Sequence, residues 1–380
     1  MPGFEYLGKE ELKQLNNLFK KEKACLFAHG FEKFRKRFHV REFEKQCARK
    51  MKTKFALAVT SGTSAIKIGL KALGVKPGDE VITQGFNFIA TVEAIIDVGA
   101  KPIMCNIDDS LNMCPEDLQK LITKKTKAII PVHMLGVSCK MDQIKKIAKK
   151  NKIKILEDNC ESMGAKYRGD FLGTLGEVGV VSYDFGKTIT CGEGGMIFTN
   201  NKKLDKYVRD YHDHGHELNP KFPRGQDTVS IVGFNYRMTE MQAIVGKEQL
   251  KKLNKIIIEN KKRYKALEKK IKKFAVLRQE PKEAKQIFDT LIVFMSSKKK
   301  RNNIVNFLKT EGFGTKNLPD AIKWHCASFW KHALPNNQIK RIKKTKVLLE
   351  NSIAIPIWLR KSVTEYAKLG DGLSKILKIN

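Results

Sequence analysis

Two residues of this chain carry the side chains that aldehyde chemistry needs. The β-favouring run Ile153–Leu156 ends just before Asp158, which predicts a carboxylate at the carboxyl end of a buried strand. A second apolar run, Val178–Ser182, leads through a short turn to Lys187. A lysine amine condenses with an aldehyde, and a carboxylate keeps a pyridine nitrogen protonated. The pair indicates a pyridoxal 5'-phosphate site, although 73 basic residues also place a lysine near an aspartate by chance.

A phosphate-binding segment is indicated by the run Ser61-Gly62-Thr63-Ser64-Ala65, which lies between a predicted strand and a predicted helix. Backbone amides and hydroxyls at the start of a helix attract anions. The same letters are also typical of an ordinary helix cap. The phosphate assignment of Gly62, Thr63 and Ser64 therefore depends on the other motifs of the chain.

Five segments that include these residues follow one another along the chain: SGTSAIKIGLKALGVKPGDEVIT, TKAIIPVHMLG, ILEDNCESMGA, GTLGEVGVVSYDFGKTITCGEGG and GFNYRMTEMQA. In this order they resemble the hallmark segments of the DegT/DnrJ/StrS family of sugar aminotransferases. Five ordered motifs are far more specific than any single one. The resemblance implies a pyridoxal-phosphate enzyme of the aspartate aminotransferase fold, which is fold type I.

The resemblance also implies a role for each matching residue. Lys187 would hold the cofactor and then move a proton, Asp158 would face the ring nitrogen, and Ser182 would add a hydroxyl to the phosphate site. Asn235, in GFNYRMTE, matches an asparagine that reaches the phosphate of the neighbouring subunit. This match predicts a homodimer with shared active sites.

Two positions around the cofactor ring leave alternatives open. Phe88 matches the aromatic residue that stacks on the ring, and Phe86 is the competing candidate because it points to the same side of an extended segment. Glu161 departs from the glutamine of many relatives, which contacts the phenolic oxygen of the cofactor. A carboxylate at this place would repel that oxygen unless it were protonated or turned away.

Lysine at position 187 favours transamination, because a branch of the family with histidine there dehydrates sugars. The expected reaction moves an amino group from glutamate, or from glutamine, to a nucleotide-linked keto-sugar or an aldehyde sugar. The product would serve cell-surface polysaccharide or lipopolysaccharide biosynthesis. Candidate substrate residues are His133, His216, Arg237 and His325, and Arg37 and Arg224 would add positive charge.

A second substrate is indicated by the segments MPGFE, FGKTITCGEGG, YHDHGHE and LPDAIKWHCASFW. They are similar to a branch that aminates an eight-carbon sugar acid and gives 8-amino-3,8-dideoxy-octulosonate. In YHDHGHE, His212, His214 and His216 invite a metal interpretation. Histidines at every second position, with a glycine between two of them, are more typical of a loop near the substrate than of a complete coordination shell. We therefore expect no metal.

Alternating strand and helix patterns from residue 55 onward must position these residues. They predict an α/β fold whose large domain, residues 1–250, has a mostly parallel sheet wrapped by helices. Residues 251–380 are expected to form a smaller C-terminal α+β domain. A helix over Lys9–Lys23 is expected to pack through Leu12, Leu15, Leu18 and Phe19.

The formal net charge of +33 raises the alternative of a nucleic-acid-binding protein. The lysines are spread along the chain rather than gathered in a recognisable module, so we expect no nucleic-acid partner. The segment AHGFEKFRKRFH is better explained as a substrate loop or a subunit interface. Scattered cysteines, with no apolar run long enough to span a membrane, predict a cytoplasmic protein without membrane attachment.

Overall fold

The computed structural model describes residues 3–22, 25–32, 34–219 and 221–379. Its centre is a seven-stranded sheet with the strand order β1-β9-β8-β5-β4-β2-β3. The strands are β1 (Phe55–Val59), β2 (Glu80–Gln84), β3 (Lys101–Cys105), β4 (Thr126–Ile130), β5 (Lys154–Asp158), β8 (Val178–Ser182) and β9 (Gly195–Thr199). Strand β9 runs antiparallel to β1 and β8, and the other neighbouring strands pair in parallel. The expected mostly parallel α/β sheet is confirmed.

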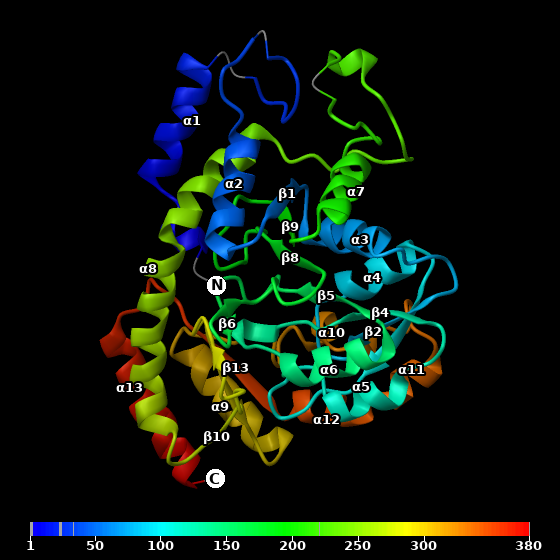
Figure 1. Cartoon of the computed structure of the whole chain (residues 1–380). Coiled ribbons are helices and arrows are strands. Elements are labelled where there is room, and N and C mark those ends of the chain that lie inside the picture. The colour runs from blue at the N-terminus through cyan, green and yellow to red at the C-terminus, as the bar shows by residue number, and fades with distance from the viewer. Residues whose placement is uncertain (1–2, 23–24, 33, 220, 380) are drawn as a thin grey trace.

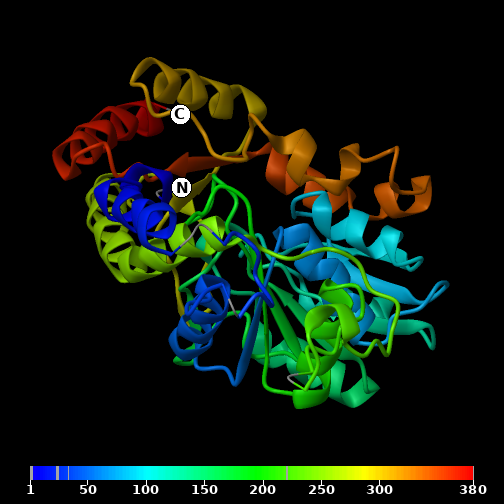
Figure 2. The same ribbon diagram turned by 90° about the horizontal axis from the view of Figure 1, so that it is seen from above.

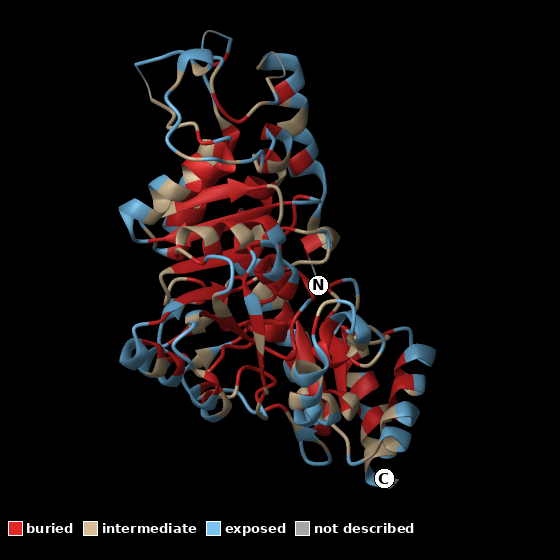
Figure 3. Ribbon diagram, turned by 90° about the vertical axis from the view of Figure 1, so that its right-hand side faces the viewer, coloured by how far each residue is buried: buried red, intermediate tan, exposed pale blue. Residues whose placement is uncertain are grey.

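Helices cover both faces of this sheet (Figure 1). Successive residues of β1 point to opposite faces, as the strand period requires: Leu57 packs in the layer of α3, whereas Ala58 packs in the layer of α2. The helices around the sheet are α2 (His39–Met51), α3 (Gly62–Ala72), α4 (Ala90–Asp97), α5 (Pro115–Leu121), α6 (Met141–Asn151) and α7 (Lys202–His212). Figure 3 shows the strands buried between these layers, so the sheet is a rigid support for the loops that follow it.

The C-terminal part forms a second, smaller core. The antiparallel sheet β10-β12-β13 packs with the long helix α8 and the terminal helix α13, which lie side by side in Figures 1 and 2. The elements are α8 (Glu240–Ile271), β10 (Val276–Leu277), β12 (Thr290–Phe294), α9 (Lys298–Thr310), β13 (Ser352–Pro356) and α13 (Val363–Ile379). A domain boundary at residue 250 falls inside α8, which continues unbroken from one core to the other.

The remaining short elements connect the two parts. Residues 322–350 form α10 (Ile322–His325), α11 (Asn336–Arg341) and α12 (Lys343–Glu350), and Trp330 packs there against Met104 of β3. A further small sheet contains β6 (Lys166–Tyr167), β7 (Asp170–Phe171) and β11 (Ala284–Lys285). Segments of the C-terminal half thus return to the large sheet and pack beside β3.

The N-terminal helix differs in part from the expectation. Helix α1 spans Lys9–Lys21, and Lys23 lies outside the described residues. Leu18 is buried, but Leu12 and Phe19 are 59% and 55% exposed. The packed face instead contains Glu11, which accepts hydrogen bonds from Gln249 and Lys252 of α8. The predicted packing through the apolar stripe is therefore wrong for Leu12 and Phe19, because α8 presents polar side chains to α1.

No helix in the described parts of the chain combines the length and the apolar character that crossing a bilayer requires.

Candidate active site

A cavity of about 380 Å³ lies at the carboxyl edge of the large sheet. The carboxyl ends of parallel strands meet at one edge, so the loops after β1, β2, β4, β5 and β8 all contribute to it. The lining residues are Ser61, Gly62, Thr63, Ile66, Phe88, Ala90, Thr91, Val132, Asp158, Cys160, Glu161, Ser182, Asp184, Lys187, Glu193, Asn317 and His325. Lys187 and Asp158 thus share one cavity.

One wall of the cavity is the N-terminus of α3. The first amides of the helix, on Gly62 and Thr63, have no carbonyl partner within it, and the helix dipole favours an anion there. A Cβ atom on Gly62 would lie 2.9 Å from Cβ of Ser182, so glycine lets the helix start approach the end of β8. This wall is suited to a phosphate group.

Ser64 departs from the expectation for this wall. Its hydroxyl donates to the Ser61 carbonyl at 2.8 Å, and its amide donates to Ser61 Oγ at 3.1 Å. Both donors are used in the N-cap of α3, and Ser64 does not line the cavity. The phosphate-ligand assignment of Ser64 is therefore corrected to a capping role. Ser61, which was not among the predicted phosphate ligands, does line the cavity.

Asp158 ends β5 and is 3% exposed. The Thr91 hydroxyl donates to its Oδ2 at 2.8 Å, and the Cys160 amide donates to its Oδ1 at 3.1 Å. Each carboxylate oxygen is thus fixed by one hydrogen bond and keeps further lone pairs for a ligand. The arrangement can stabilise a positive charge placed in the cavity.

Lys187 is ion-paired with Glu161, and its Nζ lies 3.0 Å from Oε1. Burial by itself would lower the pKa of the Lys187 amine, but the attraction of Glu161 outweighs it and raises the pKa above its usual value. Burial would raise the pKa of Glu161, but the nearby cations Lys187 and Lys316 lower it to about 2. The carboxylate is therefore ionised, and it faces an ammonium group.

A second buried lysine extends this pair. Lys316 Nζ lies 3.8 Å from Oε2 of Glu161 and donates to Asp289 Oδ2 at 2.7 Å. The sequence did not single out Lys316, which stands just before the segment LPDAIKWHCASFW but in no motif that indicates a charged site. Basic and acidic side chains thus alternate from Lys187 through Glu161 and Lys316 to Asp289 in one buried region.

The two phenylalanine candidates are separated by the structure. Phe88 is 44% exposed and lines the cavity, whereas Phe86 is fully buried in the core. The ring of Phe88 stacks on Trp324 at 6.4 Å and lies 5.5 Å from the His325 ring. Burial lowers the pKa of His325 despite the attraction of Glu161. His325 therefore presents a neutral imidazole to the cavity.

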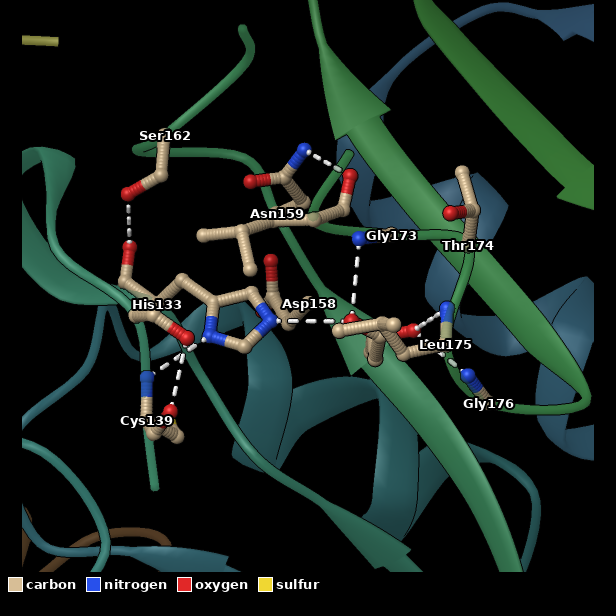
Figure 4. A network of polar contacts seen from close by, with 12 residues as sticks. His133, Cys139, Asp158, Asn159, Ser162, Gly173, Thr174, Leu175 and Gly176 are labelled. Carbon is tan, nitrogen blue, oxygen red and sulfur yellow. Dashed lines mark hydrogen bonds and ion pairs between the residues drawn. The ribbon is translucent and has the colours of Figure 1, made fainter. Parts of the chain in front are cut away.

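His133 does not reach the cavity, which corrects its assignment as a substrate residue. It is fully buried, its Nδ1 accepts from the Cys139 amide at 3.1 Å, and its Nε2 lies 3.1 Å from Glu157. Figure 4 shows the ring of His133 between Cys139 and the turn that begins at Gly173. Because Nδ1 accepts, Nε2 carries the proton and donates to Glu157. His133 holds the ends of β4 and β5 in place.

Three other candidates lie in the loop segment 213–237, outside the cavity of this chain. Arg237 pairs with Asp213 at 2.5 Å, and His216 Nδ1 lies 3.3 Å from Asp227. Asn235 is exposed and accepts from the Arg237 amide at 3.4 Å. Figure 1 shows this segment, in green, extending past the sheet beside the blue N-terminal loop. One chain alone does not bring these residues to Lys187.

The expected positive pocket is therefore not formed by the arginines within one chain. Arg224 pairs with Asp213 at 2.5 Å, and Arg37 pairs with Glu42 at 2.8 Å. Among the described residues, Lys187 is the only lysine or arginine that lines the cavity. The described part of the chain also contains no group of three or more His, Cys, Asp and Glu residues that could hold a metal ion.

The residues that line the cavity fit pyridoxal phosphate. The N-terminus of α3 suits its phosphate, Asp158 suits a protonated ring nitrogen, and Lys187 suits its aldehyde. Within the described residues, Glu161 Oε2 and Asn317 Nδ2 are buried without a hydrogen-bond partner, and both residues line this cavity. Such atoms point to a polar ligand.

Comparisons with known proteins support this interpretation. A sequence profile of the DegT/DnrJ/EryC1/StrS aminotransferase family matches residues 23–371. The chain is 37% identical over 253 residues to a GDP-perosamine synthase of Escherichia coli O157:H7, covering 66% of this chain and 67% of that protein. It is 40% identical over 214 residues to a GDP-perosamine synthase of Caulobacter vibrioides, covering 56% of each chain, so little more than half of that relative is matched.

A solved structure resembles the whole chain. It is a GDP-4-keto-6-deoxymannose-3-dehydratase with a trapped PLP-glutamate geminal diamine, and it matches 98% of each chain with a TM-score of 0.80 and 25% identity.

Proposed function

Because this chain belongs to the DegT/DnrJ/EryC1/StrS aminotransferase family, whose cofactor is pyridoxal phosphate, we propose that it transfers an amino group from glutamate to a nucleotide-linked keto-sugar. The observation that carries the proposal is the placement of Lys187 and Asp158 in one cavity beside the N-terminus of α3. The product would enter cell-surface polysaccharide biosynthesis, including that of lipopolysaccharide.

Six of the residues that line the cavity have a defined task in this proposal. When bound, pyridoxal phosphate supplies an aldehyde that takes up the donor amine and a ring that withdraws electrons. Gly62, Thr63 and Ser182 bind the phosphate, and Asp158 keeps the ring nitrogen protonated. Phe88 covers the ring, and the Lys187 amine moves the proton at the substrate carbon.

Glu161 determines where the proton on Lys187 resides. Its ionised carboxylate stabilises the ammonium form of Lys187, which can give a proton back. For Lys187 to take a proton from the substrate, the amine must first be neutral. We infer that movement of Lys187 away from Glu161 lowers the pKa of its amine and prepares it as a base.

The name that two relatives share favours a GDP-linked keto-sugar as the acceptor. GDP-perosamine synthases are the two relatives described above. The alternative acceptor is the 8-oxo form of an eight-carbon sugar acid, which would give 8-amino-3,8-dideoxy-octulosonate. The dehydratase of similar fold suggests a third reaction, but a lysine at position 187 favours transamination over dehydration.

We also propose a homodimer in which each cavity is completed by the partner chain. Lys187 is the only lysine or arginine among the described cavity-lining residues, whereas a carboxylate or diphosphate substrate needs cations. The loop with Asn235 and Arg237 carries exposed apolar residues, Val232 at 82% and Phe234 at 46%. Such a surface suits burial against a second copy. The eight scattered cysteines suit a cytoplasmic location.

A half-reaction screen tests the proposed function. Protein saturated with pyridoxal phosphate should change its absorbance spectrum on addition of glutamate, and a productive keto-sugar should restore the first spectrum. GDP-4-keto-6-deoxymannose and the 8-oxo sugar acid are compared, and mass spectrometry should detect an added amino group. K187A should give neither spectral change. A wild-type protein without a glutamate-dependent change, or one that removes a hydroxyl without adding nitrogen, contradicts the proposal.

The nucleic-acid alternative predicts a different result. It requires a protein that does not bind pyridoxal phosphate and that retards labelled DNA in a gel.

A further inference from the structure

The carboxylate of Glu161 lies between two buried lysines. Its Oε1 is 3.0 Å from Nζ of Lys187, and its Oε2 is 3.8 Å from Nζ of Lys316. Only the first of these distances is that of a hydrogen bond, and among the described residues Oε2 has no hydrogen-bond partner. Lys316 therefore lies near enough for its charge to lower the pKa of Glu161, while the oxygen that it faces stays free to accept a hydrogen bond.

Lys316 reaches this place from the smaller C-terminal core. Its amide donates to the Ala354 carbonyl of β13 at 2.8 Å, and its Nζ donates to Asp289 Oδ2 at 2.7 Å. Lys316 is 5% exposed and does not line the cavity. It stands behind the cavity wall, where it can act on Glu161 without contacting a ligand.

Lys187 cannot stay with Glu161 throughout the proposed reaction. Its amine has to reach the aldehyde of the cofactor and later the proton at the substrate carbon, and in those states it no longer donates to Oε1. A buried carboxylate that loses its paired cation is strongly destabilised. Glu161 is only 9% exposed, so solvent offers it little compensation.

The other titratable groups around this pair do not replace the missing charge. His325 of α10 lies near Glu161, but burial lowers the pKa of its imidazole, which is therefore neutral at pH 7. Asp184 and Cys160 lie near Lys187 and favour its ammonium form. None of these three groups supplies a positive charge for Glu161.

We propose that Lys316 is a positioning residue that takes over the Glu161 carboxylate whenever Lys187 leaves it. A shift of about 1 Å would bring its Nζ into hydrogen-bond distance of Oε2. An ammonium group has three donors, so Lys316 can keep its contact with Asp289. The carboxylate stays paired, and Lys187 can move without leaving a buried charge alone. The role of Lys316 in turnover rests on the proposed function, whereas the exchange of partners is a property of the chain itself.

Unfolding measurements on cofactor-free protein at pH 7 test the exchange. K187M and K316M each leave Glu161 with one cation, whereas K187M/K316M leaves it with none. The unfolding equilibrium constant of the double variant should therefore rise by about tenfold or more beyond the product of the two single effects. The lost contact between Lys316 and Asp289 is common to both backgrounds and cancels. E161Q in the double variant should restore most of this excess, because it removes the unpaired charge.

K247M is the matched control. Lys247 is also 5% exposed, and its Nζ lies 2.6 Å from Oε2 of Glu42, which is a different carboxylate. Lys247 does not line the cavity. Combined with K187M, K247M should change the unfolding equilibrium constant by the product of the single effects. It reports the general cost of removing a buried lysine charge.

The reactivity of Lys187 is the second measurement, because a purely structural Lys316 would not change it. K316M leaves Lys187 as the only cation paired with Glu161, which favours the ammonium form. Acylation of Lys187 at pH 8 should therefore slow by roughly threefold or more relative to the exposed Lys202. K316R keeps the charge and should stay within about twofold of the wild type. K247M should leave the rate unchanged.

Effects of K187M and K316M on unfolding that multiply without excess overturn the inference, as does an excess that E161Q leaves in place. So does a rate at Lys187 that is unchanged in K316M or equally slowed in K247M. Should the double variant not fold, the rates at Lys187 decide. A wild type that transfers no amino group defeats the proposed function but not this inference, because neither measurement uses cofactor or substrate.

Discussion

The Nζ atom of Lys187 lies 3.0 Å from Oε1 of Glu161. This distance places the proposed proton carrier in an ion pair with a carboxylate that also lies near Lys316, which is in turn paired with Asp289. The repulsion expected between Glu161 and an anionic ligand atom is thus partly offset by two cations. The pair has consequences for reactivity and for stability, and each can be measured on protein without cofactor.

E161Q should make the Lys187 amine more reactive. Glu161 raises the pKa of Lys187, and an adjacent opposite charge typically shifts a pKa by about 1–3 units. Its removal should therefore increase the neutral fraction at pH 8 by about tenfold or more. Acylation of Lys187 across a pH series, followed by peptide mass spectrometry, measures this fraction. The exposed Lys202 of the same protein is the reference, and an equal rate at Lys187 in both proteins would contradict the expectation.

Glu161 should also contribute to the pH dependence of stability. Its pKa in the folded protein is about 2, below the ordinary value of 4.5, so its contribution is fully present above pH 5 and is lost as the pH falls toward 2. The difference in unfolding free energy between wild type and E161Q should shrink by about 2 kcal/mol from pH 6 to pH 3. Urea unfolding at the two pH values measures it. Parallel curves would show that Glu161 titrates normally.

Substitution of Asp158 should reduce catalysis more than substitution of Thr91. D158N removes the charge that keeps the ring nitrogen protonated, and kcat/KM should fall by about 100-fold or more. T91V removes only the hydrogen bond to Oδ2 of Asp158, and about a tenfold loss is expected. Steady-state kinetics with fixed acceptor, together with circular dichroism, separate these losses from unfolding. A larger loss of kcat/KM in T91V than in D158N would contradict these assignments.

His133 should matter for stability and not for ligand binding. H133A leaves the Cys139 amide without its buried acceptor and removes one hydrogen bond from Glu157, so the unfolding free energy should fall by about 2–4 kcal/mol. The Kd of pyridoxal phosphate for the folded protein should stay within about twofold. H325A is the comparison, because His325 lines the cavity beside Phe88 and should change turnover. Loss of substrate affinity in a fully folded H133A would restore its role as a substrate residue.

Asn235 should act on the neighbouring subunit. If it completes the partner's phosphate site, N235A and K187A should each be inactive alone. After subunit exchange the mixture should recover up to about one quarter of wild-type activity, because heterodimers contain one intact site. Equal amounts are mixed under mild dissociating conditions and assayed against unmixed controls. A mixture as inactive as its components would contradict the assignment of Asn235 to the site of the neighbouring subunit.

The sequence by itself determined the residues that follow the strands of the large sheet. Asp158 and Lys187 were found because apolar runs mark the strands, and because parallel strands bring their carboxyl ends to one edge; Ser182 was indicated by the family resemblance. Periodicity placed the helices for the same reason, since a short local pattern decides which face of an element is buried.

Only the tertiary structure decided which of the remaining candidate residues lie in or beside the cavity. The hydrogen bonds of His133 to Cys139 and Glu157, the support of Asp158 by Thr91, and the approach of Lys316 to Glu161 join segments that no local pattern brings together. The apolar stripe of α1 was misjudged for the same reason, because its packing partner α8 presents Gln249 and Lys252. Whether a side chain is buried or hydrogen-bonded depends on the residues that face it. Those residues come from distant parts of the chain and meet only in the folded structure.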